Sequence, residues 1–205
     1  CQINGSPLTM VFDPGAEVCV VEKNHWRQRA FAEPTGPPQS RIRGVGGIVP
    51  VWSINATVSL GKIRKTVPII VMETTNIPLL GQTFFGDLEY NIDNATATIR
   101  FKRPGARGDY VPVDTIDIPY TPSGNNLIVT AKVNGKPMRF FFDTGAQGTL
   151  VSTGDKLSNG DNGWRLIGYG GSSGVGGSSR TAVYEVEMIE LGPIRQRNMR
   201  VAVGG

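Results

Sequence analysis

The stretch Phe140-Phe141-Phe142-Asp143-Thr144-Gly145-Ala146 decides the fold, because it sets an acidic residue and a glycine turn at the end of an apolar run. Three consecutive phenylalanines predict a strand that is buried on both faces. A carboxylate at the mouth of such a strand is partly desolvated, and the glycine permits a sharp turn whose backbone N–H groups point back at it. The stretch therefore predicts an acid whose proton affinity is set by its surroundings.

The same pattern occurs a second time in the chain, 130 residues earlier, around Asp13. Residues 3–16 align with residues 133–146, and seven of the 14 aligned positions are identical. Background composition gives about one identity over this length. The chain therefore contains an internal duplication, which has to be recognised before any single motif is interpreted.

Two further landmarks repeat in the same order. The glycine-rich segment Gly44-Val45-Gly46-Gly47 returns at the same offset as Gly174-Val175-Gly176-Gly177. The segment Leu60-Gly61 returns as Leu191-Gly192 after a shift of one residue. Three landmarks in matching order indicate two copies of one folding unit.

Short turns between strands dominate both copies. Asn4-Gly5 and Asn134-Gly135 are strong signals for two-residue hairpin turns, in which both central residues need a positive φ. Alternating apolar and polar residues recur over 54–60 and 183–191, and we find no amphipathic helix longer than about three turns. With 27 glycines and 14 prolines among 205 residues, the sequence predicts an all-β fold.

The copies differ at their ends. We expect a first lobe over residues 1–103, a linker with Pro104-Gly105 over 104–117, and a second lobe over 118–205. The first copy continues into Leu79-Leu80-Gly81 and a strand-like stretch over 90–101, which the second copy lacks. The second copy has a leading strand over 126–132 without a counterpart in the first. We therefore expect trimmed ends, with the C-terminal part of the second lobe missing.

Composition argues against several other classes of function. Two cysteines and one histidine do not provide a ligand set for a structural zinc, so we expect neither a metal nor another cofactor. No apolar run approaches the ~20 residues that a membrane-spanning helix needs. The net charge of +4 is scattered and lacks aromatic platforms between the basic residues, so no nucleic-acid partner is expected.

The motif at Phe142-Asp143-Thr144-Gly145-Ala146 resembles the active-site signature of retropepsin-like aspartic proteases of clan AA. Leu79-Leu80-Gly81 resembles the second signature of that family, and the glycine-rich segments resemble its flaps. The resemblance implies two retropepsin-like β-barrel lobes in tandem, related by a pseudo-twofold axis. It also implies that each lobe contributes one catalytic aspartate and that a β-hairpin flap closes over the substrate.

Carried onto this sequence, the resemblance implies an aspartic endopeptidase that hydrolyses extended polypeptide through a dyad of Asp13 and Asp143, which activates water. It implies a polypeptide substrate, a monomer with fused lobes or a homodimer, and a periplasmic or cell-envelope location. The implied active-site loops and flaps comprise these residues: Pro14, Gly15, Ala16, Thr144, Gly145 and Ala146 in the loops; Gly44, Val45, Gly46, Gly47, Gly174, Val175, Gly176 and Gly177 in the flaps.

One position departs from the family pattern. Pro14 stands where the family has threonine, whose hydroxyl is implied to bond across the lobe interface, and proline has neither a hydroxyl nor a backbone N–H. Three outcomes stay open: a weakened fused dyad, an active homodimer formed through the second copy, or a protein that keeps the groove and has lost the chemistry. The alternative function is therefore a catalytically impaired module that binds extended peptides in the groove between the lobes.

Overall fold

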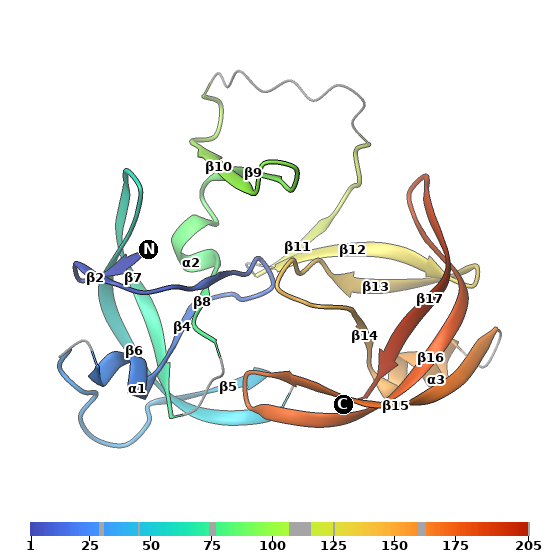
Figure 1. Ribbon diagram of the computed structural model, residues 1–205, viewed down its shortest axis with the longest axis horizontal. Coiled ribbons are helices and arrows are strands. Elements are labelled where there is room, and N and C mark those ends of the chain that lie inside the picture. The colour runs from blue at the N-terminus through green and yellow to red at the C-terminus, as the bar shows by residue number, and fades with distance from the viewer. Residues whose placement is uncertain are drawn as a thin grey trace.

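The computed structural model describes residues 1–28, 31–44, 46–73, 77–106, 116–124, 126–159 and 163–204. Strands dominate it, as the glycine and proline content predicts, and they form two large sheets (Figure 1). Within these ranges, no helix has the length and apolar character that a membrane span requires. The predicted all-β, two-lobe architecture is therefore confirmed.

Lobe 1 is built on an eight-stranded sheet with the order β2-β1-β6-β7-β4-β8-β3, and β5 pairs with β6. Its strands are β1 (Gln2–Ile3), β2 (Ser6–Pro7), β3 (Val11–Phe12), β4 (Cys19–Glu22), β5 (Ser40–Gly44), β6 (Gly47–Leu60), β7 (Ile63–Met72) and β8 (Leu79–Leu80). Most pairs are antiparallel, but β3 runs parallel to β8, and β4 runs parallel to β7.

Lobe 2 is built on a seven-stranded sheet with the order β11-β12-β16-β17-β14, in which β13 pairs with β12 and β15 with β16. Its strands are β11 (Thr121–Ser123), β12 (Asn126–Val133), β13 (Lys136–Phe141), β14 (Thr149–Val151), β15 (Trp164–Gly174), β16 (Gly177–Leu191) and β17 (Ile194–Val203). The parallel pair of β14 and β17 repeats the pair of β4 and β7. The sequence duplication is therefore also a duplication of topology.

In the described ranges, three short helices and one extra hairpin complete the fold. The helices are α1 (Lys23–Arg27), α2 (Gln82–Phe85) and α3 (Thr153–Asn159). The stretch predicted as a strand over 90–101 is instead a hairpin of β9 (Glu89–Asp93) and β10 (Thr98–Lys102), which lies above α2 in Figure 1. A single strand is excluded there because Ala97 adopts a φ of 50° and turns the chain back. The boundaries at 103, 104–117 and 118 stay a prediction, since residues 107–115 lie outside the described ranges.

The predicted Asn-Gly turns are present in both lobes. Asn4 and Gly5 have φ values of 47° and 85°, and Asn134 and Gly135 have 49° and 82°. The turns join Ile3 to Ser6 and Val133 to Lys136 in register. An acidic loop follows each hairpin in the sequence. Strand β3 ends at Phe12, directly before Asp13, and β13 ends at Phe141, two residues before Asp143.

Each lobe has its own apolar core. The core of lobe 1 includes Phe84 and Phe85, which are fully buried, and that of lobe 2 is centred on Val133, Val186 and Val201. The run before Asp143 departs from the prediction of burial, since Phe141 is 62% and Phe142 is 44% exposed. The prediction fails because burial of this run needs a neighbouring strand, which lobe 1 has in β8 and the described part of lobe 2 does not.

Candidate active site

Two acidic loops form the candidate site, one from each lobe. In lobe 1 the Asp13 Oδ1 atom accepts hydrogen bonds from the backbone N–H groups of Gly15 (2.8 Å) and Ala16 (3.0 Å). In lobe 2 the Asp143 Oδ1 atom accepts one from Gly145 N–H (2.7 Å). The turn after each strand therefore folds its amides back onto the carboxylate, as the glycine spacing predicts.

The carboxyl groups of Asp13 and Asp143 lie beside each other across the lobe interface. The glycines of both loops make this approach sterically possible. A Cβ atom on Gly15 would lie 2.6 Å from Asp143 Cγ, and one on Gly145 would lie 3.0 Å from Asp13 Cγ. A side chain at Gly15 would therefore displace the Asp143 carboxyl group, and one at Gly145 would crowd that of Asp13.

The two acids differ in exposure. Asp13 is 8% exposed, whereas Asp143 is only partly buried. Burial, the hydrogen bond to Asp143 and the charge of Asp143 together raise the pKa of Asp13 from 3.8 to about 6, against the lowering effect of the Gly15 and Ala16 amides.

Gln82 supports the lobe 1 loop and was not identified in the sequence. Its buried side-chain amide donates a hydrogen bond to the Pro14 carbonyl (3.0 Å), and its backbone N–H donates to the Ala16 carbonyl (2.9 Å). Gly81 allows this contact, since a Cβ there would lie 2.3 Å from the Val18 carbonyl oxygen. The only available signal was a polar residue directly after the Leu-Leu-Gly segment.

The implied bridge through threonine is absent from the structure. Pro14 is buried in lobe 1, while Thr144 is exposed in lobe 2. Across the described ranges no hydrogen bond of the Thr144 hydroxyl joins the lobes, so this implied role is wrong for Thr144. The lobe 1 loop is held instead from its own lobe, by the Gln82 amide and by Leu80, whose carbonyl accepts the Asp13 N–H (3.1 Å).

The glycine-rich segments form the tips of two long hairpins, β5–β6 and β15–β16 (Figure 1). In these tips Gly44 pairs with Gly47, and Gly174 pairs with Gly177. Val45 lies outside the described residues. The tips touch each other, since the Gly46 N–H donates to the Val175 carbonyl (3.0 Å).

The tip of lobe 2 also reaches the apolar interior of lobe 1. Val175 packs against a buried cluster in lobe 1 formed by Val20, Val51, Ile70 and Met72. A second link between the lobes is polar, because the Asn126 side-chain N–H donates to Glu17 Oε1 (2.9 Å). Among the described residues, the acidic loops, the tips and this polar contact therefore each link the two lobes.

Comparison with known proteins gives one result at the family level. The sequence profile described as aspartyl protease matches residues 1–84 and 129–204, which is more than half of the chain. The two matched segments correspond to the two copies, and they include both acidic loops and both glycine-rich tips. No curated protein matches the chain.

Proposed function

We propose, from the premise that this chain belongs to the retropepsin-like aspartyl protease family, that it is an endopeptidase acting on extended polypeptide. The observation that carries the proposal is the close approach of the two carboxyl groups, since a Cβ atom on Gly15 would lie 2.6 Å from Asp143 Cγ and one on Gly145 would lie 3.0 Å from Asp13 Cγ. Two carboxylates this close cannot both ionise at moderate pH, so one holds a proton while the other is charged. A proton donor and a proton acceptor therefore lie side by side.

In the proposed reaction the ionised carboxylate takes a proton from a water molecule as the water oxygen attacks the peptide carbonyl carbon. The protonated carboxyl group donates its proton to the carbonyl oxygen, so the charge on the dyad is unchanged in this step. The tetrahedral intermediate then collapses and the C–N bond breaks. The leaving amine takes a proton from the dyad, and one hydroxyl group of the intermediate returns a proton to the other carboxylate as the carbonyl re-forms. No metal or organic cofactor takes part in this scheme.

The glycine-rich tips act as flaps in this proposal. Their contact through Gly46 and Val175 closes the side of the site that the two hairpins cover, and opening this contact admits substrate. An extended peptide presents backbone N–H and C=O groups in the same manner as a strand, so it is the substrate shape that fits beneath two hairpins.

The experiment is hydrolysis of a pool of unstructured peptides by the full chain, followed by mass spectrometry. We expect cleavage that a statine-type inhibitor blocks and that Asp143→Asn abolishes. Asp117→Asn is the matched control, because Asp117 is exposed and lies outside the acidic loops. Unchanged turnover in Asp143→Asn would defeat the proposal.

A second candidate function is peptide binding without cleavage, which Pro14 favours because it removes the bracing hydroxyl from one loop. In that case peptides bind to the groove between the lobes, the full chain leaves them intact, and Asp13→Asn binds them as well as the unmodified protein does. Cleavage that depends on both acids excludes this alternative.

A further inference from the structure

The two flap hairpins carry different side chains at positions that the duplication makes equivalent. In the lobe 1 hairpin, Ile42 pairs directly with Val49. In the lobe 2 hairpin, Ser172 pairs directly with Ser179, and these are the equivalent residues at the constant offset of 130. Because a cross-strand pair shares one face of a hairpin, an aliphatic pair in lobe 1 is replaced by a hydroxyl pair in lobe 2.

The aliphatic pair of lobe 1 belongs to a larger apolar surface, which we call the aliphatic wall. Its partly buried members pack against a buried cluster of aliphatic side chains. The members are Val18, Ile42, Val49 and Leu79, and the cluster behind them is Val20, Val51, Ile70 and Met72. The partly buried members are within reach of a ligand, and the buried cluster holds them in place.

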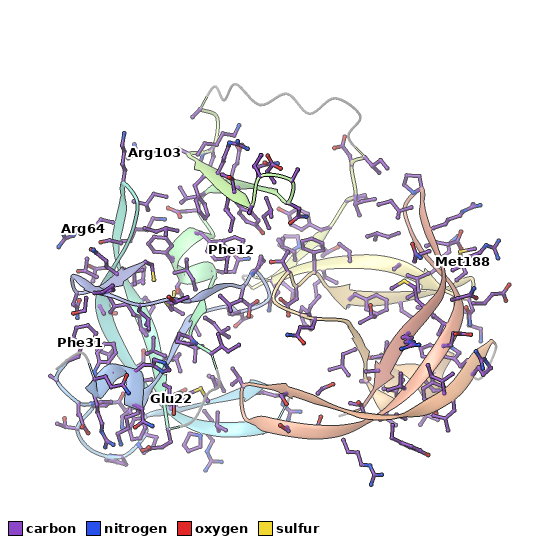
Figure 2. All side chains as sticks on the ribbon, viewed as in Figure 1. Phe12, Glu22, Phe31, Arg64, Arg103 and Met188 are labelled. Carbon is purple, nitrogen blue, oxygen red and sulfur yellow. The ribbon has the colours of Figure 1, made fainter. Side chains whose placement is uncertain are left out.

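The aliphatic wall extends from the acidic loop to the flap of lobe 1. At one end Leu79 directly precedes Leu80, whose carbonyl accepts the Asp13 N–H (3.1 Å). At the other end the aliphatic pair lies in the flap hairpin, next to the glycine-rich tip. Figure 2 labels Phe12, directly before the acidic loop, and Glu22, at the end of β4. A peptide held between the acidic loops and the flaps therefore has this wall on its lobe 1 side.

The aliphatic wall already receives one side chain from outside lobe 1. Val175, at the tip of the lobe 2 hairpin, packs against the buried cluster, although it belongs to the other lobe. Its backbone is held there, since its carbonyl accepts the Gly46 N–H (3.0 Å). A branched aliphatic side chain that arrives across the lobe interface is therefore the class of group that this wall accepts.

The equivalent surface of lobe 2 is smaller and more polar. Equivalence follows from the offset of 130 and, for the residue paired with Val20, from the matching strand pairs of the two lobes. Gly148 replaces Val18, Ser172 and Ser179 replace Ile42 and Val49, Thr181 replaces Val51, Ala202 replaces Ile70, and Leu150 replaces Val20. All of these replacements but the last remove apolar volume or add a hydroxyl group.

The two serines lie on the face of the lobe 2 hairpin that corresponds to the wall. Ser172 and Ser179 are partly buried, and Thr181 on the same face of β16 is 3% exposed. The next pair toward the tip, Ser173 with Ser178, is exposed, and its hydroxyl groups are hydrogen-bonded to each other (2.8 Å). Successive residues of a strand point to opposite faces. Hydroxyl groups of lobe 2 therefore lie where lobe 1 has aliphatic side chains.

We propose, resting on the endopeptidase function proposed above, that the cleft selects two unlike side chains around the bond it cleaves. A branched aliphatic side chain lies against the wall of lobe 1 in the place of Val175, which the opening of the tips withdraws. A small or hydroxyl-bearing side chain lies against lobe 2.

The two sides reject each other's side chains for different reasons. A large aliphatic side chain on the lobe 2 side would bury the Ser172 and Ser179 hydroxyls without hydrogen-bond partners. A hydroxyl-bearing side chain on the lobe 1 side would itself be buried unpaired, because every side chain of the aliphatic wall is apolar. The substrate class is therefore an extended peptide with an unlike pair at the cleaved bond, such as valine beside serine.

The test measures binding of non-cleavable hydroxyethylene analogues to the full chain by calorimetry. The two central side chains of the analogues are isopropyl and hydroxymethyl groups in all combinations and both orders. The tighter of the two mixed analogues is expected to bind roughly tenfold or more tightly than either analogue with two equal side chains. This comparison does not depend on the direction in which the peptide runs through the cleft, because both orders are measured.

A double variant transfers the chemistry of lobe 1 to lobe 2. Ser172→Ile combined with Ser179→Val copies the aliphatic pair, so we expect the analogue with two isopropyl groups to become the tightest ligand. Ser173→Ile combined with Ser178→Val is the matched control on the opposite face of the same hairpin, and it should keep the preference for a mixed analogue. Preference of the unmodified protein for two isopropyl groups, the same preference in the double variant as in the unmodified protein, or no binding of any analogue would each overturn the proposal.

Peptide hydrolysis is measured separately, so the two proposals can fail independently. Preference for a mixed analogue, together with peptides that stay intact, supports the selection of unlike side chains and contradicts the endopeptidase function. Cleavage mainly between two aliphatic residues supports the endopeptidase function and contradicts the selection.

Discussion

Asp13 and Asp143 occupy matching positions in the two copies, but they lie in different surroundings. Asp13 is enclosed by the loop that Gln82 and Leu80 hold, whereas the loop of Asp143 is exposed over Thr144, Gly145 and Ala146. Burial costs the ionised form of a carboxyl group free energy, so the two carboxyl groups do not have equivalent electrostatic surroundings. The asymmetry arises from what surrounds each motif, since the motifs themselves are nearly identical.

The first prediction concerns pH. The pKa of Asp13 is raised to about 6, so Asp13 holds its proton below that pH and loses it above. Since the reaction needs one proton on the dyad, we expect kcat/KM to fall about tenfold per pH unit above roughly pH 6. A pH–rate profile on a short peptide measures this. Activity that stays constant up to pH 8, or a maximum well below pH 4, contradicts it.

The second prediction concerns Gln82, which positions the lobe 1 loop and does not touch the reacting atoms. Gln82→Ala leaves the buried Pro14 carbonyl without its donor, so we expect kcat to fall by roughly ten- to a hundredfold with a smaller change in KM. Gln82→Glu keeps the size of the side chain but, when ionised, has no donor, and it should fail in the same way. Gln196→Ala, on the exposed part of β17, is the control. Normal kcat in Gln82→Glu would show that the donor is unimportant.

At the scale of elements, local turn chemistry made the hairpins predictable. Asn4-Gly5 and Asn134-Gly135 adopt the positive φ values that their residue types favour, whatever surrounds them. The hairpin of β9 and β10 was predicted as one strand because its turn, over residues 94–97, lies within an otherwise strand-like composition. The burial of Phe141 and Phe142 was predicted wrongly because a residue pattern does not reveal whether a neighbouring strand is present.

In the candidate site, too, some features could be predicted from the sequence and others could not. The duplication identified both aspartates and both glycine-rich tips, because two matching motifs at one offset are improbable by chance. Gln82 was not predictable, since its role depends on a close approach between segments that are 68 residues apart in the sequence. The contact of Glu17 with Asn126, 109 residues away, could not be predicted from the sequence for the same reason.

The third prediction belongs to the flap hairpins. A Cβ atom on Gly46 would lie 2.2 Å from the backbone of Gly176, so Gly46→Ala forces the two tips apart. We expect faster amide exchange at Gly46 and roughly a tenfold loss of kcat/KM, because the flaps no longer close together. Gly168→Ala is the matched control, since no atom lies within 4 Å of a Cβ at that position of β15. Equal activity in the two variants contradicts a role for tip contact.

At the scale of the whole molecule, the lobes are joined by the acidic loops, the tips and the contact of Asn126 with Glu17.

The fourth prediction concerns the contact of Asn126 with Glu17. Asn126→Asp replaces a donor by an anion beside Glu17, so we expect a loss of about 1 kcal/mol of unfolding free energy at pH 7. Salt screens this repulsion, so the loss should shrink in about 1 M NaCl. Urea denaturation at low and high salt measures it, with Asn94→Asp as the exposed control. An equal loss at both salt concentrations would contradict the electrostatic cause.

The central claim is that Asp13 and Asp143 of one chain act as a single catalytic unit, and kcat/KM of Asp13→Asn, Asp143→Asn and the double variant tests it most directly. Residues that act as a unit are not additive in mutational effects. We therefore predict that each single variant loses roughly a thousandfold or more and that the double variant is no worse than either. Full activity in Asp13→Asn, with activity abolished in Asp143→Asn, would contradict the claim and assign catalysis to a dyad of two lobe 2 acids from separate chains.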